Sequence, residues 1–262
     1  MKKTVIMMLM AIAPAWAMAQ ENIEADIQAD VVSKNLWRGQ DLGGVSIKPR
    51  AEVRWKGIYL NAAGATGFDA ATKEYIDVNV GYRAPFGLNF GVGTHWQSGF
   101  DTLNRFLHFK SKETGHHFEA NLGYTNKYFS LQAYTTFGGN DFKGVNGDRA
   151  YSTYVELAVP FRLAGIDWQA VAGVTPMESN GWYEAFDSGD PRNNQIYQYY
   201  YADGFACVQA ALRATKSINV ANFEVPLFVE FNTNPYSKKA AFVAGFTLKP
   251  FQKNCCKKGC KQ

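Results

Sequence analysis

The chain has 262 residues, a formal net charge of +4 and 15% aromatic residues. This net charge is too small to create a strongly positive surface, so we expect no nucleic acid as a partner. No stretch approaches the roughly 18 apolar residues of a transmembrane helix, so a membrane crossing would have to use strands.

The N-terminus has the pattern of a secretory signal peptide. Residues 1–3 (Met-Lys-Lys) are basic, residues 4–16 are apolar, and residues 17–19 (Ala-Met-Ala) form a small-x-small cleavage site. We therefore expect a signal peptide at 1–19 and a mature chain that starts at Gln20. The alternative is a retained helical anchor, for which the apolar stretch is short. Loss of the two leader lysines lowers the formal charge from +4 to +2.

Behind the leader, polar and apolar residues alternate in segments that have the length of barrel strands. In residues 45–55 the odd positions are largely apolar and the even positions are polar. Successive side chains of a strand point to opposite faces, so one face is apolar and the other charged. We expect twelve strands, at residues 24–37, 45–55, 58–66, 74–84, 88–97, 116–125, 128–137, 150–161, 166–175, 204–215, 223–232 and 239–249.

The connections between these strands alternate between short and long. The connections after even-numbered strands are 56–57, 85–87, 126–127, 162–165 and 216–222. The connections after odd-numbered strands are 38–44, 67–73, 98–115, 138–149, 176–203 and 233–238. Outer-membrane barrels have short periplasmic turns and longer outer loops, whereas a β-sandwich would not readily give this asymmetry. We therefore predict an all-β, transmembrane, antiparallel up-and-down barrel at 20–251, in the cell outer membrane, with both termini periplasmic.

Two further features of the strands lead to predictions. Aromatic residues gather near the strand ends, as in the girdles of membrane barrels, although aromatics also favour strands in general. The outer set is Trp37, Trp96, Phe137, Tyr151 and Phe231, and the periplasmic set is Trp55, Tyr82, Tyr124, Phe129, Phe161 and Phe223. Pro49 lies in mid-strand and cannot donate to a ladder, which predicts a bulge or a local break.

The C-terminal segment 252–262 is predicted to be a basic, Cys-containing periplasmic tail. Cys255, Cys256 and Cys260 lie among lysines, with no histidine nearby. In an oxidising envelope such thiols can pair within or between chains. The composition favours a solvated tail over a metal site.

The polar face of the strands supplies candidate residues for the lumen. They are Lys48, Arg50, Glu52, Arg54, Asp77, Asn79, His95, Glu119, Glu156, Asp167, Arg213 and Glu230. Because buried charges must be paired or hydrated, either water fills the lumen or these residues form an ionic network. Twelve strands lie between the side-chain-filled eight-stranded barrel and the open larger porins, so both a narrow channel and a plugged barrel stay open. The column Lys48, Arg50 and Arg54 could face anions, or it could pair with the carboxylates.

We predict no enzymatic activity, no cofactor and no metal. Ser98 and His95 are close in sequence, but no nucleophile motif frames them. His108, Glu113, His116 and His117 could hold a surface metal, although a polar loop is the commoner explanation. The longest loop, 176–203, carries the binding candidates Trp182, Tyr183 and Tyr199, because loops of this length are usually functional.

Residues 30–49 resemble the first strand and loop of a bacterial porin family often called the TorF type. Members carry a Ser-x-Tyr-aromatic-x-Arg-Gly-like signature soon after the leader, which Ser33, Trp37, Arg38 and Gly39 match, with Asn35 where Tyr is usual. The run 147–157 is also similar to members of this group. The resemblance implies an outer-membrane barrel and a pore, and it supplies no substrate and no site residues.

These patterns predict a porin-like protein for passive diffusion of small hydrophilic solutes through a narrow, mixed-charge lumen. Its other expected partners are outer-membrane lipids and the outer-membrane assembly machinery, and the oligomeric state stays open. The alternative is a non-conducting barrel that binds partners or serves a structural role through its long loops. A third and weaker hypothesis is an outer-membrane lipid hydrolase.

Overall fold

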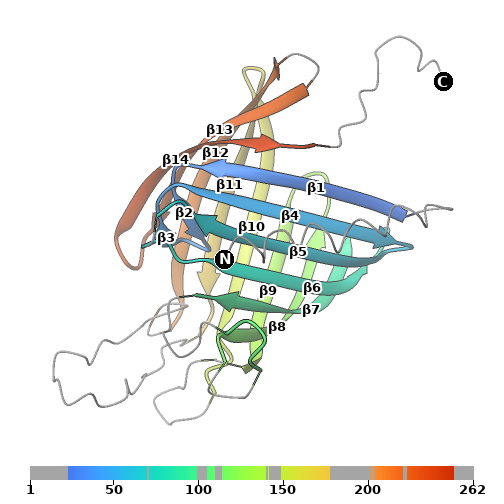
Figure 1. The fold of residues 1–262 in the computed structure, drawn as a ribbon, viewed down its shortest axis with the longest axis vertical. Helices are drawn as coiled ribbons and strands as arrows, with labels where there is room; N and C mark the ends of the chain where they lie inside the picture. Colours follow the sequence, from blue (N-terminus) through green and yellow to red (C-terminus); the bar gives the residue numbers. More distant parts are fainter. Residues whose placement is uncertain are drawn as a thin grey trace.

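The structure is a computed structural model that describes residues 23–69, 71–98, 105–109, 114–139, 149–177, 204–220 and 223–250, with Asp141 and Ala202. The predicted twelve-stranded, all-β antiparallel barrel is confirmed, since twelve of its fourteen strands close into one barrel (Figure 1). No helix within the described ranges is long and apolar enough to cross a membrane.

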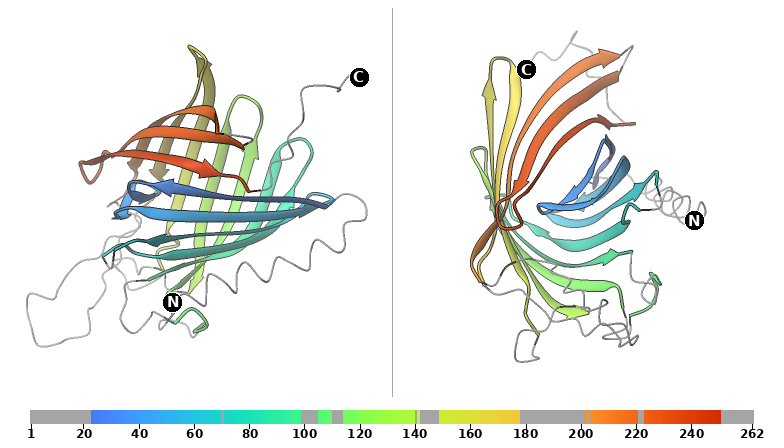
Figure 2. Two further views of the ribbon diagram at one scale, coloured as in Figure 1. Left: turned by 45° about the horizontal axis from the view of Figure 1, so that its top comes forward. Right: turned by 90° about the vertical axis from the view of Figure 1, so that its left-hand side faces the viewer.

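The barrel has a simple up-and-down order, in which strands pair with their neighbours in sequence and β1 pairs with both β4 and β14. The barrel strands are β1 (Ile23–Val32), β4 (Ser46–Trp55), β5 (Ile58–Gly67), β6 (Tyr75–Arg83), β7 (Leu88–Gln97), β8 (His116–Thr125), β9 (Ser130–Gly139), β10 (Thr153–Leu163), β11 (Ile166–Thr175), β12 (Ala206–Val220), β13 (Phe223–Asn234) and β14 (Lys239–Leu248). Figure 2 shows them as a curved wall around one interior.

The outer surface of the barrel is apolar because the alternation runs as expected. Exposed large side chains recur at every second position, as in Phe90 and Val92 of β7 and in Leu227, Val229 and Phe231 of β13. In a soluble protein such a surface would drive association, whereas in a bilayer it contacts lipid. Buried polar residues, by contrast, are numerous among the described side chains.

Only some of the aromatic side chains that were predicted to form the girdles point outward. Seven of their aromatics are exposed large hydrophobics, namely Trp55, Tyr124, Phe137, Tyr151, Phe161, Phe223 and Phe231. The assignment of Trp37 to the outer set is wrong, because its ring stacks on His95 and lines an interior cavity. Trp96 is only 7% exposed and packs against Phe106.

Pro49 produces a local break and no bulge. Its pairing with Ala29 of β1 is in register. On the other side, the β4–β5 ladder skips Lys48 and Pro49 and resumes at Arg50 and Ala63 with an unchanged register. The missing N–H therefore interrupts one ladder, and the other holds the strand in place.

The prediction of a single strand at 24–37 is wrong. Strand β1 ends at Val32, and the next residues form a separate two-stranded hairpin of β2 (Asn35–Trp37) and β3 (Gln40–Gly43). Arg38 and Gly39, both at positive φ, make the turn between them. Figure 1 places this hairpin next to the ends of β1 and β4, and its contacts lie across the lumen. We call residues 35–43 the lumen hairpin.

Candidate functional site

The lumen hairpin is anchored by apolar side chains inside the barrel. Leu36 packs against a cluster of Val32, Phe228 and Val243. Leu42 is 3% exposed and belongs to a second cluster with Ala65 and Tyr75. The hairpin thus buries apolar surface where an outer loop would expose it to water, which stabilises the inward position.

Trp37 connects the hairpin to two walls of the lumen. It packs against the cluster of Leu42 and Tyr75, and also against a third cluster of Tyr154 and Val208. Its ring stacks on His95 with centroids 4.2 Å apart. Because these neighbours come from β6, β7, β10 and β12, the indole lies between walls on different sides of the barrel.

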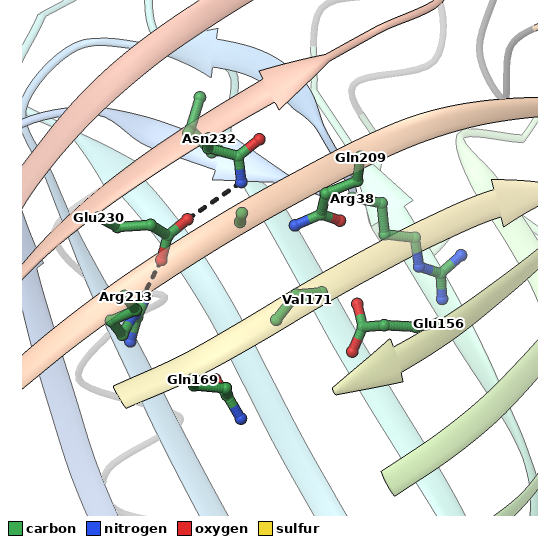
Figure 3. Close-up of a pocket in the computed structure, with 10 residues that line it drawn as sticks. Arg38, Glu156, Gln169, Val171, Gln209, Arg213, Glu230 and Asn232 are labelled. Atoms are coloured by element: carbon green, nitrogen blue, oxygen red, sulfur yellow. Dashed lines mark hydrogen bonds and ion pairs between the residues drawn. The ribbon is translucent and has the colours of Figure 1, made fainter. Parts of the chain in front are cut away.

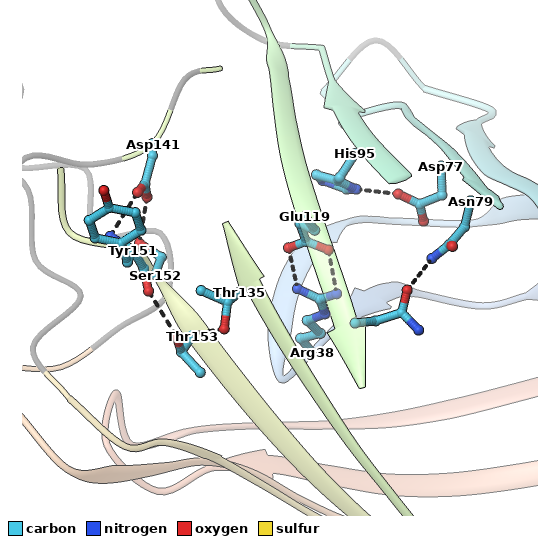
Figure 4. Close-up of polar contacts among 11 residues, drawn as sticks. Arg38, Asp77, Asn79, His95, Glu119, Thr135, Asp141, Tyr151, Ser152 and Thr153 are labelled. Atoms are coloured by element: carbon cyan, nitrogen blue, oxygen red, sulfur yellow. Dashed lines mark hydrogen bonds and ion pairs between the residues drawn. The ribbon is translucent and has the colours of Figure 1, made fainter. Parts of the chain in front are cut away.

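Arg38, at the tip of the hairpin, reaches the opposite wall. Its two terminal nitrogens each donate to one carboxylate oxygen of Glu119, both at 2.8 Å (Figure 4). The guanidinium also lies 4.5, 4.3 and 5.2 Å from the ring centres of Trp37, Tyr134 and Tyr154. Fork-to-fork pairing and aromatic stacking are geometries that suit arginine better than lysine.

Polar contacts hold the base of the hairpin. Lys48 Nζ donates to the carbonyl of Leu36 at 2.9 Å, and Asn35 donates to the carbonyl of Lys73 at 3.2 Å. The backbone N–H of Lys73 in turn donates to Leu42 at 2.8 Å. Burial lowers the pKa of Lys73, which lies in the connection between β5 and β6. The hairpin is therefore held from both sides of its base as well as at its tip.

Two polar cavities, each of about 230 Å³, lie beside the hairpin. The first is lined from Leu36 and Arg38 across to β10–β13 (Figure 3). The second is lined by residues of β5–β10 together with Trp37 and Arg38. Arg38 and Glu156 line both cavities, so these two residues lie between them.

The structure brings several of the predicted lumen residues to these cavities. Asp77, Asn79, His95, Glu119 and Glu156 line the second. Glu156, Arg213 and Glu230 line the first.

Most of these groups already have partners. His95 Nδ1 and Asp77 are 2.5 Å apart, and Asn79 donates to Asn121 at 3.1 Å. Arg213 donates to Glu230 at 2.7 Å, and Asn232 donates to the same carboxylate at 3.0 Å.

The predicted basic column does not act as one unit. Lys48 donates its hydrogen bond to Leu36 of the hairpin. Arg54 contacts Glu52 at 2.5 Å and Glu24 at 3.1 Å, and Arg83 reaches Glu52 at 3.2 Å. The guanidinium of Arg50 lies against the side-chain amide of Gln28. Neither cavity is lined by Arg50, Glu52 or Arg54.

Asp167 lies away from both cavities. It faces Arg162 at 3.6 Å across the β10–β11 turn, and the two side chains are 69% and 72% exposed. The loop candidates Trp182, Tyr183 and Tyr199 and the tail cysteines lie outside the described residues.

The described residues show no arrangement that supports the weaker enzymatic and metal alternatives. Ser98 Oγ accepts from the backbone of Glu74 at 2.8 Å, whereas His95 is engaged with Asp77 and Trp37. His116 and His117 are consecutive residues of β8 and so point to opposite faces. Within the described residues, no three His, Cys, Asp or Glu side chains gather as metal ligands.

The signature residues have identifiable structural roles, which the sequence reasoning did not predict. Ser33 exchanges two hydrogen bonds with the backbone of Ala244, at 2.8 and 2.9 Å, where β1 meets β14. A Cβ at Gly39 would collide with the carbonyl of Val208. The inward position of the lumen hairpin could have been predicted from its apolar content, since Leu36, Trp37 and Leu42 are unusual in a loop exposed to water.

Comparison with known proteins gives the following likenesses. No protein-family description and no curated protein matches the sequence. Among solved structures, the NanC porin is 10% identical over 86% of this chain and 98% of that chain, with a TM-score of 0.38. Salmonella typhi OmpF, solved with daunomycin, is 11% identical over 86% of this chain and 96% of that chain, with a TM-score of 0.33. A bacterial polysaccharide outer membrane secretin is 11% identical over 88% of this chain and 99% of that chain, with a TM-score of 0.32. The fold assignment rests on the strand pairing of this chain.

Proposed function

We propose that the protein is an outer-membrane, porin-like channel through which small hydrophilic solutes diffuse passively. The observation that carries the proposal is the lumen hairpin with a polar cavity on each side. A plug that existed only to close the barrel would be expected to pack apolar or fully paired surface against the whole wall. Here the hairpin narrows the lumen and leaves charged and amide side chains lining open space.

The apolar outer surface supports the membrane location. It requires outer-membrane lipids as surroundings, and the twelve strands would reach the membrane through the outer-membrane assembly machinery. The short connections described at Lys56-Gly57 and Ala164-Gly165 are two-residue turns, as expected for periplasmic turns. The signal peptide proposed at 1–19 would export the chain.

The test is conductance of the purified full-length protein in planar bilayers. We expect discrete single-channel steps, because water and ions would fill the cavities beside the hairpin. Replacement of residues 36–42 by two glycines should raise the conductance severalfold, because it removes Leu36, Trp37, Arg38 and Leu42 from the lumen.

A matched control for the deletion is Phe242→Ala, which changes a 78% exposed outward side chain and should leave conductance unchanged. Wild-type protein that shows no conductance above an empty bilayer would contradict the proposal. The alternative of a surface-binding barrel would then be preferred, and it stays a prediction because the longest loop lies outside the described residues.

A further inference from the structure

We propose that the part of the lumen beside the lumen hairpin selects for small cations and ammonium-bearing solutes, and that Glu156 is the residue that determines this preference. The inference deepens the proposed function and rests on it. It is opposite in sign to the first of the two alternatives for the basic column, that it faces anions, and it agrees with the second, that it pairs with carboxylates.

Carboxylates outnumber basic side chains around the lumen hairpin. Among the described residues, the charged side chains that line the two cavities are two arginines, Arg38 and Arg213, and four carboxylates, Asp77, Glu119, Glu156 and Glu230. These four carboxylates therefore outnumber the two guanidinium groups by two. Lys48 and Asp30, which lie close to this group, cancel one another. A lumen wall with excess carboxylate raises the local concentration of cations and excludes anions.

The two arginines that line the cavities are already engaged. Arg38 is held by both oxygens of Glu119. Arg213 is held by Glu230, whose other oxygen accepts from Asn232. The two arginines beside the hairpin therefore neutralise specific carboxylates. Their attraction for a passing anion is weaker than that of two unpaired guanidinium groups.

Glu156 differs from the other three carboxylates, which each lie against a basic side chain. One of its oxygens accepts from the hydroxyl of Tyr154 at 2.9 Å, and that hydroxyl also contacts Gln209 Oε1 at 2.6 Å. Among the residues that the structure describes, no ion pair joins Glu156 to a cation. A carboxylate that forms no ion pair among the described residues, and that lines two cavities, is a counter-charge for a passing solute.

The position of Glu156 makes its charge effective along the route. Figure 3 shows its carboxylate between the Arg38 side chain and Gln169 in the first cavity, and it also lines the second. A solute that passes from one cavity to the other meets this group and the neutral amides of Gln169 and Gln209. This chemistry suits a small ammonium compound better than a carboxylate or phosphate, which would meet repulsion without a free guanidinium.

The experiment is the reversal potential of the reconstituted full-length protein under a KCl gradient, repeated with methylammonium chloride. We expect K⁺ and methylammonium to permeate in preference to Cl⁻. Glu156→Gln keeps the shape and the hydrogen bond to Tyr154. It should lower the cation-to-anion permeability ratio by about thirtyfold, because loss of the charge changes the occupancy of a cation and of an anion by about fivefold each, in opposite directions, from Coulomb's law at contact distance in water. Asp167→Asn, which removes a carboxylate at the exposed turn, is the matched control and should leave the ratio unchanged.

Each outcome separates the two proposals. Wild-type channels that prefer Cl⁻, or a Glu156→Gln ratio equal to that of wild type, would overturn the inference and leave the pore intact. Absence of any conductance would overturn the pore and the inference with it. If Glu156→Gln does not assemble, the sign of the wild-type reversal potential and the charge-conserving Glu156→Asp, which should remain cation-selective, decide the question.

Discussion

At the scale of single residues, the most informative contact is the pair of Arg38 and Glu119. The two side chains are only 12% and 11% exposed, and they lie 81 positions apart in sequence. Taking two charges out of water is costly, so this pair contributes stability only because both oxygens and both nitrogens are matched. Removal of one partner leaves the other charge buried without compensation.

Arg38→Gln should lower the free energy of unfolding by about 3 kcal/mol, because the largely buried carboxylate of Glu119 would lose its bidentate donor. Denaturant titration of the protein in lipid vesicles, followed by tryptophan fluorescence, measures this change. Arg162→Gln is the matched control. It breaks an exposed pair and should change the free energy by at most about 0.5 kcal/mol. Equal effects of the two variants would show that the pair at the hairpin tip is not stabilising.

At the scale of elements, the lumen hairpin is a short ribbon that could not form alone. Its strands β2 and β3 have three and four residues, and an isolated two-stranded hairpin is marginal in water. Its stability comes from the clusters that receive Leu36, Trp37 and Leu42 and from the turn at Arg38-Gly39. The turn requires a glycine for two separate reasons, namely a positive φ of 76° and the closeness of Val208.

These two reasons can be separated by comparing two glycines. Gly165 has a φ of 75° with no atom near its missing Cβ, so Gly165→Ala should cost only the left-handed backbone, about 1 kcal/mol. Gly39→Ala should cost more and should also raise the conductance, because the added methyl collides with the wall strand and displaces the hairpin from the lumen. Unfolding titrations and single-channel recordings together test this. Equal stability losses, with unchanged conductance, would contradict it.

At the scale of the whole molecule, the barrel is closed unevenly. Strand β1 pairs with β4 from Ile23 to Val32 but with β14 only from Ala29 to Val32. The seam ends where β14 ends, at Leu248, two residues before Pro250, which has no N–H to donate. Among the described residues, which end at Pro250, the part of β1 from Ile23 to Gln28 is therefore paired with β4 and not with β14.

Hydrogen exchange should reveal this uneven closure. Every second amide of Ile23–Gln28 faces the seam without a β14 partner, so peptides from this half of β1 should exchange faster than those from Ala29–Val32. Strand β4, which is paired on both sides, is the control and should be protected apart from the break at Pro49. Mass spectrometry of the protein in lipid nanodiscs measures the rates, and uniform protection along β1 would contradict the expectation.

The alternation of side chains along the strands determined the barrel, its strand number and much of the polar face. A residue's face depends only on the parity of its position in a strand, so no long-range information is needed. For this reason, the sequence predicted strands close to β7, β8 and β11, and it also predicted the break at Pro49.

The lumen hairpin was decided by the tertiary structure alone. Residues 35–43 form two very short strands around a turn, so no sustained alternation reports on which side of the wall they lie. Their position depends on Glu119, Val208 and Phe228, which become neighbours only when the barrel closes. Parity could therefore place Glu156 on the polar face, but only the folded barrel decided that Glu156 borders two cavities while Arg38 is engaged with Glu119.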